Sequence, residues 1–249
     1  MGRADAQPPP VAASDADTVA YFDAYVPEYD PGRLELAADY IRRHASADSE
    51  LIDLGCGVGN TLAFLAEQTP ITRFAALDVS QNCLDKTREL VECETVLGSA
   101  VDASVAARLA GRFDFAILSA VLHHLVGRTR AESRRNAVDA VRNALTMLTD
   151  EGSLVIHEPV FEQKLAMDAV FWAKRGLSRV SGNRRVPVLG YWGNLGAPVV
   201  SYYSDAGLAR IIAEGGGRIV EQHSEPEKLP GLMDRLLDRA STTVAVVAA

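Results

Sequence analysis

The sequence of 249 residues is poor in cysteine, and it lacks both a long apolar run and a secretion signal. Its three cysteines, at positions 56, 83 and 93, cannot form a complete disulfide framework, and their spacing fits no metal-ligand pattern. We therefore expect reduced thiols, as in the cytoplasm. No stretch of about 18 apolar residues is present, so no membrane-spanning helix is expected. The first residues also lack the apolar core of a signal peptide. These absences predict a cytoplasmic protein.

Positive charge is scarce as well. The sequence has 25 lysines and arginines against 33 acidic residues, which gives a formal net charge of −8 at pH 7. Proteins that bind nucleic acid need a basic surface to meet the phosphate backbone. We therefore expect no nucleic-acid partner. Apolar residues, at 48%, are plentiful enough to build a sizeable buried core.

Composition divides the chain into a tail and one domain. Residues 1–17 are rich in alanine, aspartate and proline, which predicts a disordered tail. From residue 18 aromatic residues appear, and an N-terminal helix is expected to end near Pro27. A single domain is predicted over 18–249, interrupted at about 160–203 by a long aromatic and basic segment. No internal repeat is found.

Strand and helix patterns alternate along this domain. The expected helices are 32–45, 61–68, 81–92, 129–148 and one that begins after Ser204, a candidate N-cap. The expected strands are 51–55, 73–80, 95–100, 113–121, 152–159, one that follows the last helix, and one at the C-terminal end. This alternation predicts an α/β fold, with a mostly parallel sheet covered by helices on both faces.

A glycine-rich loop carries the strongest functional signal. It begins at Asp53, contains Gly55, Gly57 and Gly59, and lies between an expected strand and an expected helix. Glycines at alternate positions let the backbone turn tightly and approach a ligand, and the following helix offers free N–H groups to it. Asp78 ends the next expected strand, where a carboxylate can accept hydrogen bonds from ribose hydroxyls. The pattern predicts a nucleotide-like ligand.

The glycine spacing separates two ligand classes. A dinucleotide fingerprint places its third glycine three positions after the second, which here is Asn60, whereas the third glycine is Gly59. In this spacing the chain resembles the class I S-adenosylmethionine-dependent methyltransferases, whose first motif is an acidic residue followed by such glycines. Further likeness is found at Phe113-Asp114, at the Leu-His-His-Leu stretch 122–125 and at Gly152 with its apolar strand. The resemblance covers roughly 18–160 and 204–248.

The resemblance implies a Rossmann-like, doubly wound sheet of seven strands, six parallel and one antiparallel C-terminal strand over 244–249. It also implies S-adenosylmethionine as the methyl donor. The residues then expected to contact it are Tyr21, Asp53, Gly55, Gly57, Gly59, Asp78, Ser99, Ala100 and Ser119. Many family members carry an acidic residue where Ser99 stands, so either Ser99 or Asp102 is expected to take the adenine contact.

Three histidines follow expected strands on the side where the donor is expected. They are His123, His124 and His157, and His124 and His157 are the preferred candidates for a general base that takes a proton from a hydroxyl acceptor. Such histidines also commonly bond backbone groups or contact the cofactor, and this alternative stays open. Glu158 can orient His157, join a metal site or cap a neighbouring loop. A divalent metal is left open, because no compact ligand motif requires one.

The segment 160–203 is expected to form a helical lid over the acceptor. Its net charge of +4, from six basic and two acidic residues, and its aromatic residues suit an acceptor with an anionic or sugar-like part. The proposed substrate-binding residues are Arg184, Arg185, Tyr191 and Trp192. The alternative is a solvated pair of amphipathic helices that forms a homodimer contact.

The function predicted from these features is methyl transfer from S-adenosylmethionine to a small molecule. An oxygen acceptor is preferred, and a hydroxyl of a saccharide, lipid or other metabolite in particular. Signatures of base or amide N-methylation and of cytosine methylation are absent from the sequence. The alternatives are a carboxylate or N-methyltransferase, or a non-catalytic cofactor-binding protein of the same fold. An NAD-dependent oxidoreductase is disfavoured by the glycine spacing.

Overall fold

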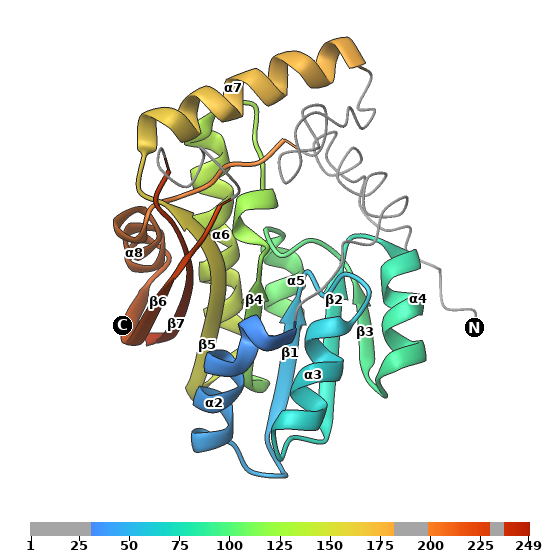
Figure 1. Ribbon diagram of the computed structural model, residues 1–249. Coiled ribbons are helices and arrows are strands. Elements are labelled where there is room, and N and C mark those ends of the chain that lie inside the picture. Colours follow the sequence, from blue (N-terminus) through green and yellow to red (C-terminus); the bar gives the residue numbers. More distant parts are fainter. Residues whose placement is uncertain (1–30, 182–198, 230–236) are drawn as a thin grey trace, which may run out of the picture.

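A seven-stranded sheet forms the centre of the molecule (Figure 1). The computed structural model describes residues 31–181, 199–229 and 237–249, with side chains up to 177 in the first range. The strand order is β3-β2-β1-β4-β5-β7-β6. Six strands run parallel, and β7 runs antiparallel to both of its neighbours. The predicted doubly wound fold with one antiparallel C-terminal strand is therefore confirmed.

The elements have the following bounds. The strands are β1 (Glu50–Leu54), β2 (Arg73–Asp78), β3 (Glu94–Leu97), β4 (Phe113–Ser119), β5 (Leu148–Phe161), β6 (Gly217–Glu227) and β7 (Arg239–Ala248). The α-helices are α2 (Glu35–His44), α3 (Asn60–Gln68), α4 (Gln81–Leu90), α5 (Ala103–Arg108), α6 (Arg130–Met147), α7 (Lys164–Ser181) and α8 (Asp205–Glu214). Two short 3-10 helices are η1 (Pro31–Leu34) and η2 (Leu122–His124).

Two hydrophobic cores, one on each face of the sheet, hold these layers together. On one face α5, α6 and α8 pack against apolar strand residues such as Ile52 and Ile156. On the other face α2, α3 and α4 pack against the alternate residues, such as Leu51 and Val155. Because side chains of a strand alternate between faces, each buried polar residue of the sheet can be assigned to one core.

The expected helices and strands within the described residues are confirmed, with two differences. Strand β5 is longer than expected: it begins directly after α6 and runs to Phe161, with a bulge in its pairing to β4 between Phe113 and Phe115. Helix α5 was not predicted from the sequence, although Asp102 caps it by accepting a hydrogen bond from the Ser104 N–H at 2.8 Å. Its six residues are too few to show a helical period.

Ser204 does cap α8, as expected, by accepting from the Gly207 N–H. The predicted tail, the aromatic N-terminal helix and residues 182–198 of the predicted lid lie outside the described residues. Within the three described ranges, no helix is both long and apolar enough to cross a membrane.

The chain reverses its winding direction between β1 and β4. Strands β2 and β3 extend the sheet on one side of β1, whereas β4, β5 and β7 extend it on the other. In open α/β sheets, ligands bind beyond the carboxyl ends of the strands at this switch point. The glycine-rich loop follows β1 and the His-His stretch follows β4, so the fold brings both predicted motifs to this place.

Candidate functional site

The glycine-rich loop has the conformation that its sequence predicts. Gly55, Gly57 and Gly59 all have positive φ angles, of 82°, 54° and 88°. Residues with a Cβ rarely adopt this left-handed region, because the Cβ approaches the following carbonyl. Gly59 is the N-cap of α3, so the three glycines lead the chain from β1 directly to a helix N-terminus.

The three glycines differ in what surrounds them. A Cβ added at Gly59 would lie 2.9 Å from the Thr87 Cα, and one added at Gly55 would lie 2.8 Å from a methyl carbon of Val121. A Cβ at Gly57 would meet nothing within 4 Å. Gly55 and Gly59 are therefore needed for packing against the rest of the protein, whereas Gly57 borders open space in which a ligand can approach the backbone.

Asp78 joins this loop to the end of β2. One carboxylate oxygen accepts from the Gly57 N–H at 2.9 Å and the other accepts from the Ser80 N–H at 2.9 Å. Each carboxylate oxygen can accept more than one hydrogen bond, so Asp78 retains acceptor capacity for ligand hydroxyls. The half-buried Asp78 thus fixes the loop at this edge of the sheet.

Asp53 is the unusual carboxylate of the site. It is 1% exposed, and neither of its oxygens has a hydrogen-bond partner within the part of the chain that the structure describes. Burial, together with the nearby charge of Asp78, raises the pKa of Asp53 to about 8. Ser119, at the end of β4, also has a buried hydroxyl without a partner among these residues. Unsatisfied buried polar groups are rare in proteins and commonly mark a ligand site.

The residues after β3 supply a further part of this edge. Ala100 is buried, and its carbonyl accepts from the Asn143 side chain at 2.9 Å. The Asp102 N–H donates to the Ser99 carbonyl at 3.0 Å, while the Asp102 carboxylate caps α5. The Asp102 carboxylate is already bonded to the N-terminus of α5, so Ser99 is the preferred candidate for the adenine contact.

Glu158 organises the chain that follows β4. It is 2% exposed, and one oxygen accepts from the N–H groups of Val121 and Leu122, both at 2.6 Å. The other oxygen lies 2.7 Å from the Nδ1 of His123. Burial raises the pKa of Glu158 to about 7, although the backbone donors act in the opposite direction. Of the roles considered for Glu158, capping a neighbouring loop is the one that these contacts show.

Residues 52–154 match the family described as the methyltransferase domain. This range includes the glycine-rich loop, Asp78, Ser119 and the His-His stretch. This match, over less than half of the chain, supports the class I S-adenosylmethionine-dependent methyltransferase family.

Two curated relatives agree with this family. A trans-aconitate 2-methyltransferase of Enterobacter sp. (strain 638) is 38% identical over 71 residues, which are 28% of this chain and 28% of the relative. A ribosomal RNA small subunit methyltransferase C of Actinobacillus succinogenes is 26% identical over 125 residues, or 50% of this chain and 36% of the relative. The matched segments thus span only about a third of these relatives. The expectation of no nucleic-acid partner stays a prediction.

A solved structure extends the likeness to almost the whole fold. The S-adenosylmethionine-dependent methyltransferase structure from Methanosarcina mazei has a TM-score of 0.57 and 12% identity, covering 84% of this chain and 98% of the other. At this level of identity the likeness concerns the fold.

The three histidines at this end of the sheet have different surroundings. His157 is buried on β5 and both ring nitrogens have partners on β7, Thr243 at 3.0 Å and Ser241 at 3.1 Å. Burial lowers its pKa to about 4. His123 is held by Glu158 and stacks on Tyr202, with ring centroids 5.1 Å apart. Burial likewise lowers the pKa of His123, to about 3.

His124 is half-buried and follows an unusual backbone conformation. Its ring lies 4.0 Å from that of His123, and burial lowers its pKa well below the usual value. Four residues earlier, Ala120 has a φ of 58°, the only positive φ of a non-glycine residue among those described. Such strained residues cluster at functional sites. This strain could not be predicted from the sequence, because alanine is not a residue that favours a positive φ.

Helix α7 brings a buried lysine to the same end of the sheet. Lys174 is 7% exposed, and burial lowers its pKa to about 8. In the sequence Lys174 is one of the six basic residues of the segment 160–203, and no local pattern marks a single lysine as buried. The predicted contacts Tyr21, Arg184, Arg185, Tyr191 and Trp192 lie outside the described residues.

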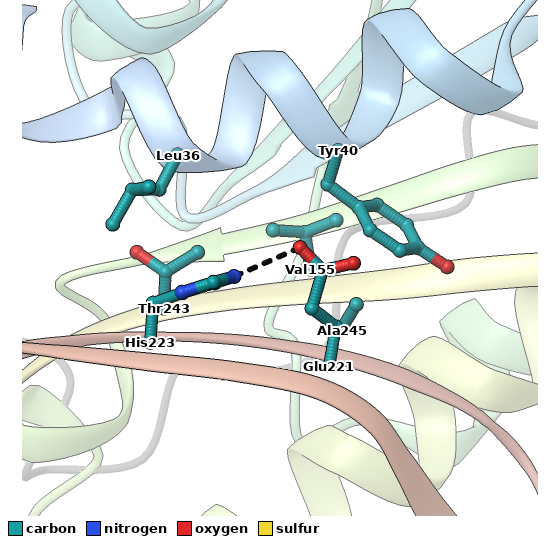
Figure 2. A pocket seen from close by; sticks show the side chains of 7 residues that line it. All are labelled: Leu36, Tyr40, Val155, Glu221, His223, Thr243 and Ala245. Carbon is teal, nitrogen blue, oxygen red and sulfur yellow. Dashed lines mark hydrogen bonds and ion pairs between the residues drawn. The ribbon is translucent and has the colours of Figure 1, made fainter.

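A small hollow elsewhere in the chain is separate from this site. It lies between α2 and the strands β5 to β7, and it is lined by Leu36, Tyr40, Val155, Glu221, His223, Thr243 and Ala245 (Figure 2). Its volume of about 10 Å³ has room for roughly one water molecule. An ion pair of 2.9 Å between His223 and Glu221 borders it. No group of three potential metal ligands occurs within the described ranges.

Proposed function

We propose that this protein transfers the methyl group of S-adenosylmethionine to an oxygen atom of a small molecule. The observation that carries the proposal is the buried, unpartnered carboxylate of Asp53 beside the open backbone at Gly57. A buried carboxylate without a donor is costly, and a ligand that brings N–H donors and a positive charge removes this cost. A nucleotide-like cation such as the methyl donor fits both features.

The described residues fit the donor along the edge from β1 to β4. In this proposal Asp53 accepts from the ammonium group of the donor, Asp78 accepts from its ribose hydroxyls, and Ser99 or Ala100 borders its adenine. Gly57 allows close approach of the loop, and Ser119 offers a hydroxyl at the end of β4. When bound, the donor supplies a methyl group on a positively charged sulfur, and the protein contributes mainly by positioning the acceptor in line with it.

A hydroxyl acceptor requires a general base, and His124 or His157 was expected to serve. His157 has both nitrogens bonded to hydroxyls of β7, so His124 is the better placed of the two. We further propose that residues 160–203 form the lid over the acceptor. Arg184, Arg185, Tyr191 and Trp192 are its proposed contacts.

The test is a pair of binding titrations followed by a turnover assay. S-adenosylhomocysteine is expected to bind the purified chain, whereas NAD is not, because the third glycine is misplaced for a dinucleotide. Labelled donor is then incubated with the protein and, in separate reactions, with a small-molecule extract or the total RNA of cells. A labelled small product supports methyl transfer. Binding without any labelled product favours a non-catalytic cofactor-binding protein, and labelling of RNA alone places the acceptor in another class.

A further inference from the structure

Helix α7 directs its charged residues toward the protein, whereas a surface helix normally directs them toward water. The half-buried Asp168 accepts from the Arg130 guanidinium at 2.9 Å, and the half-buried Arg175 donates to the Gly127 carbonyl at 2.7 Å. Lys174 is buried as well. These contacts dock the helix across one end of the molecule, at the top of Figure 1. The charged inner face leaves a different set of residues for the outer face.

The outer face of α7 is apolar. Of the residues 164–177, whose side chains the structure describes, only the first, Lys164, is both exposed and charged. Leu165 is 84% exposed and Trp172 is 53% exposed. The other exposed residues of this range are Ala169, Ala173, Gly176 and Leu177. A contiguous apolar patch of this kind marks an interaction surface.

Four of these residues form one line along the helix. Spacings of four, three and four residues place Leu165, Ala169, Trp172 and Gly176 on the same side of α7. Large and small side chains alternate in this line. A Cβ added at Gly176 would meet nothing within 4 Å, so the backbone there is open to a neighbour. The line therefore offers two projections and two shallow places beside them.

This order fits a second copy of itself. In an antiparallel pair of α7 helices with a twofold axis through the middle of the line, Leu165 lies opposite Gly176 of the second copy. Trp172 then lies opposite Ala169 of the second copy. Each large side chain meets a small one, as close helix packing requires. A twofold axis repeats each contact, so one helix face supplies both sides of the interface.

The distribution of charge favours a second copy over a lipid surface. Helices that lie on membranes carry many lysines and arginines beside their apolar face, which attract anionic lipids. The described part of α7 exposes one lysine, and the chain as a whole has a formal net charge of −8. Two such chains repel each other over most of their surface, and the line on α7 adds no negative charge to this repulsion.

We propose that the protein forms a twofold homodimer in which the α7 helices of two copies pack antiparallel through Leu165, Ala169, Trp172 and Gly176. The dimer goes beyond methyl transfer and does not depend on it.

The first experiment is sedimentation velocity of the full-length protein over a range of concentrations. Trp172→Glu and Leu165→Glu place a charge in the interface, and each change enters it twice. Leu90→Glu is the matched control, because Leu90 is 55% exposed at the end of α4, away from α7. Circular dichroism shows that the variants are folded, and cosedimentation with vesicles of phosphatidylcholine and phosphatidylglycerol tests the lipid alternative.

The wild type and Leu90→Glu are expected to sediment as dimers. Each α7 variant is expected to raise the dissociation constant by about 100-fold or more, as for central residues of an interface. A wild type that stays monomeric at every concentration overturns the inference. A dimer that is unchanged in both α7 variants overturns the assignment to this face. Vesicle binding by a monomeric wild type assigns the face to lipid instead.

Disulfide cross-linking tests the antiparallel register without adding charge. Leu165→Cys and Gly176→Cys are made as separate proteins in a Cys93→Ser background, because Cys93 is half-buried whereas the other two cysteines are buried. The two proteins are oxidised singly and as a mixture. In the proposed dimer two copies of residue 165 are about 16 Å apart along the helix axis, too far for a disulfide.

The mixture is therefore expected to give a covalent dimer, and each protein alone is not. Cross-linking of each protein with itself indicates a parallel pair and overturns the register. If neither the mixture nor the single proteins cross-link while the wild type is a dimer, the interface lies elsewhere and the inference fails. Binding of S-adenosylhomocysteine is measured separately, so failure of the dimer is distinguishable from failure of the proposed function.

Discussion

Two buried carboxylates lie at the same edge of the sheet and have opposite surroundings. Glu158, on the face covered by α6, accepts from three donors within 2.7 Å. Asp53, on the face covered by α2 and α3, has no partner among the residues that the structure describes. The hydrogen bonds of Glu158 stabilise the chain after β4, whereas the oxygens of Asp53 are available to a ligand. Burial alone therefore does not separate a structural carboxylate from a ligand-binding one, whereas the hydrogen-bond partners do.

The largest expected effect is the loss of stability in Glu158→Ala. This change leaves two backbone N–H groups and the His123 imidazole without their acceptor. We expect the free energy of unfolding to fall by about 3–5 kcal/mol, because each buried donor left without an acceptor costs about 1–3 kcal/mol. Urea unfolding followed by circular dichroism measures it. Glu158→Gln keeps an acceptor oxygen and is expected to lose less. A Glu158→Ala variant as stable as the wild type would show that these contacts are dispensable.

Asp53→Asn is expected to act on binding and not on folding. The affinity for S-adenosylhomocysteine should fall by about 10- to 100-fold, because a charged acceptor is replaced by a neutral amide.

The folded-state pKa of Asp53 is raised to about 8, far above the value of an unfolded aspartate. Stability therefore falls as the pH rises between these two values, since only the folded state keeps the proton. At pH 8 the asparagine variant of the free protein should be at least as stable as the wild type. If Asp53→Asn loses much stability but binds S-adenosylhomocysteine normally, Asp53 is a structural residue like Glu158.

Gly59 and Gly57 differ in the same way, since one is expected to matter for stability and the other for ligand binding. At Gly59 an added Cβ meets backbone at 2.9 Å, whereas at Gly57 it meets nothing. Both substitutions carry the strain of a left-handed conformation, about 1–2 kcal/mol. We expect Gly59→Ala to destabilise the protein more than Gly57→Ala, and Gly57→Ala or Gly57→Val to weaken binding of S-adenosylhomocysteine in a folded protein. Unfolding curves and calorimetry of the variants measure both effects. If Gly59→Ala and Gly57→Ala lose the same stability and the Gly57 variants still bind S-adenosylhomocysteine, the loop is only a turn and not a binding site.

The smallest effect is a dependence of binding on pH. Because the pKa of free Asp53 is raised by burial and by Asp78 to about 8, its carboxyl is mainly protonated at pH 7. A cationic ligand favours the ionised form, so binding at pH 7 should release a proton. The affinity should then rise with pH below 8, by up to about tenfold per pH unit. Calorimetry in buffers of different ionisation enthalpy counts this proton, and Asp53→Asn is the control. If wild type and variant release the same number of protons, Asp53 is not the group involved.

The sequence predicts the parts of this molecule that depend on local pattern. The alternation of apolar strands and helices predicted the sheet, and the glycine spacing after Asp53 predicted the loop with its three positive φ angles. Helix α5 was missed because it is short, and β5 was predicted too short because its first residues form a bulge.

The contacts between distant segments could not be predicted. Glu158 reaches the N–H groups of residues 36 and 37 positions earlier in the chain, and no local pattern records this pairing. The inward position of Lys174 depends on how α7 docks, which is set by Arg175 and Gly127 in space. The roles of His124 and His157, which were proposed from their positions after strands, stay predictions.

Calorimetric titration of S-adenosylhomocysteine into three proteins tests the central claim most directly. The wild type and Glu158→Gln are expected to show saturable binding to one site with similar affinity, and Asp53→Asn is expected to bind much more weakly. Equal binding by all three proteins, or no binding by the wild type, would contradict the assignment of Asp53 to the methyl donor.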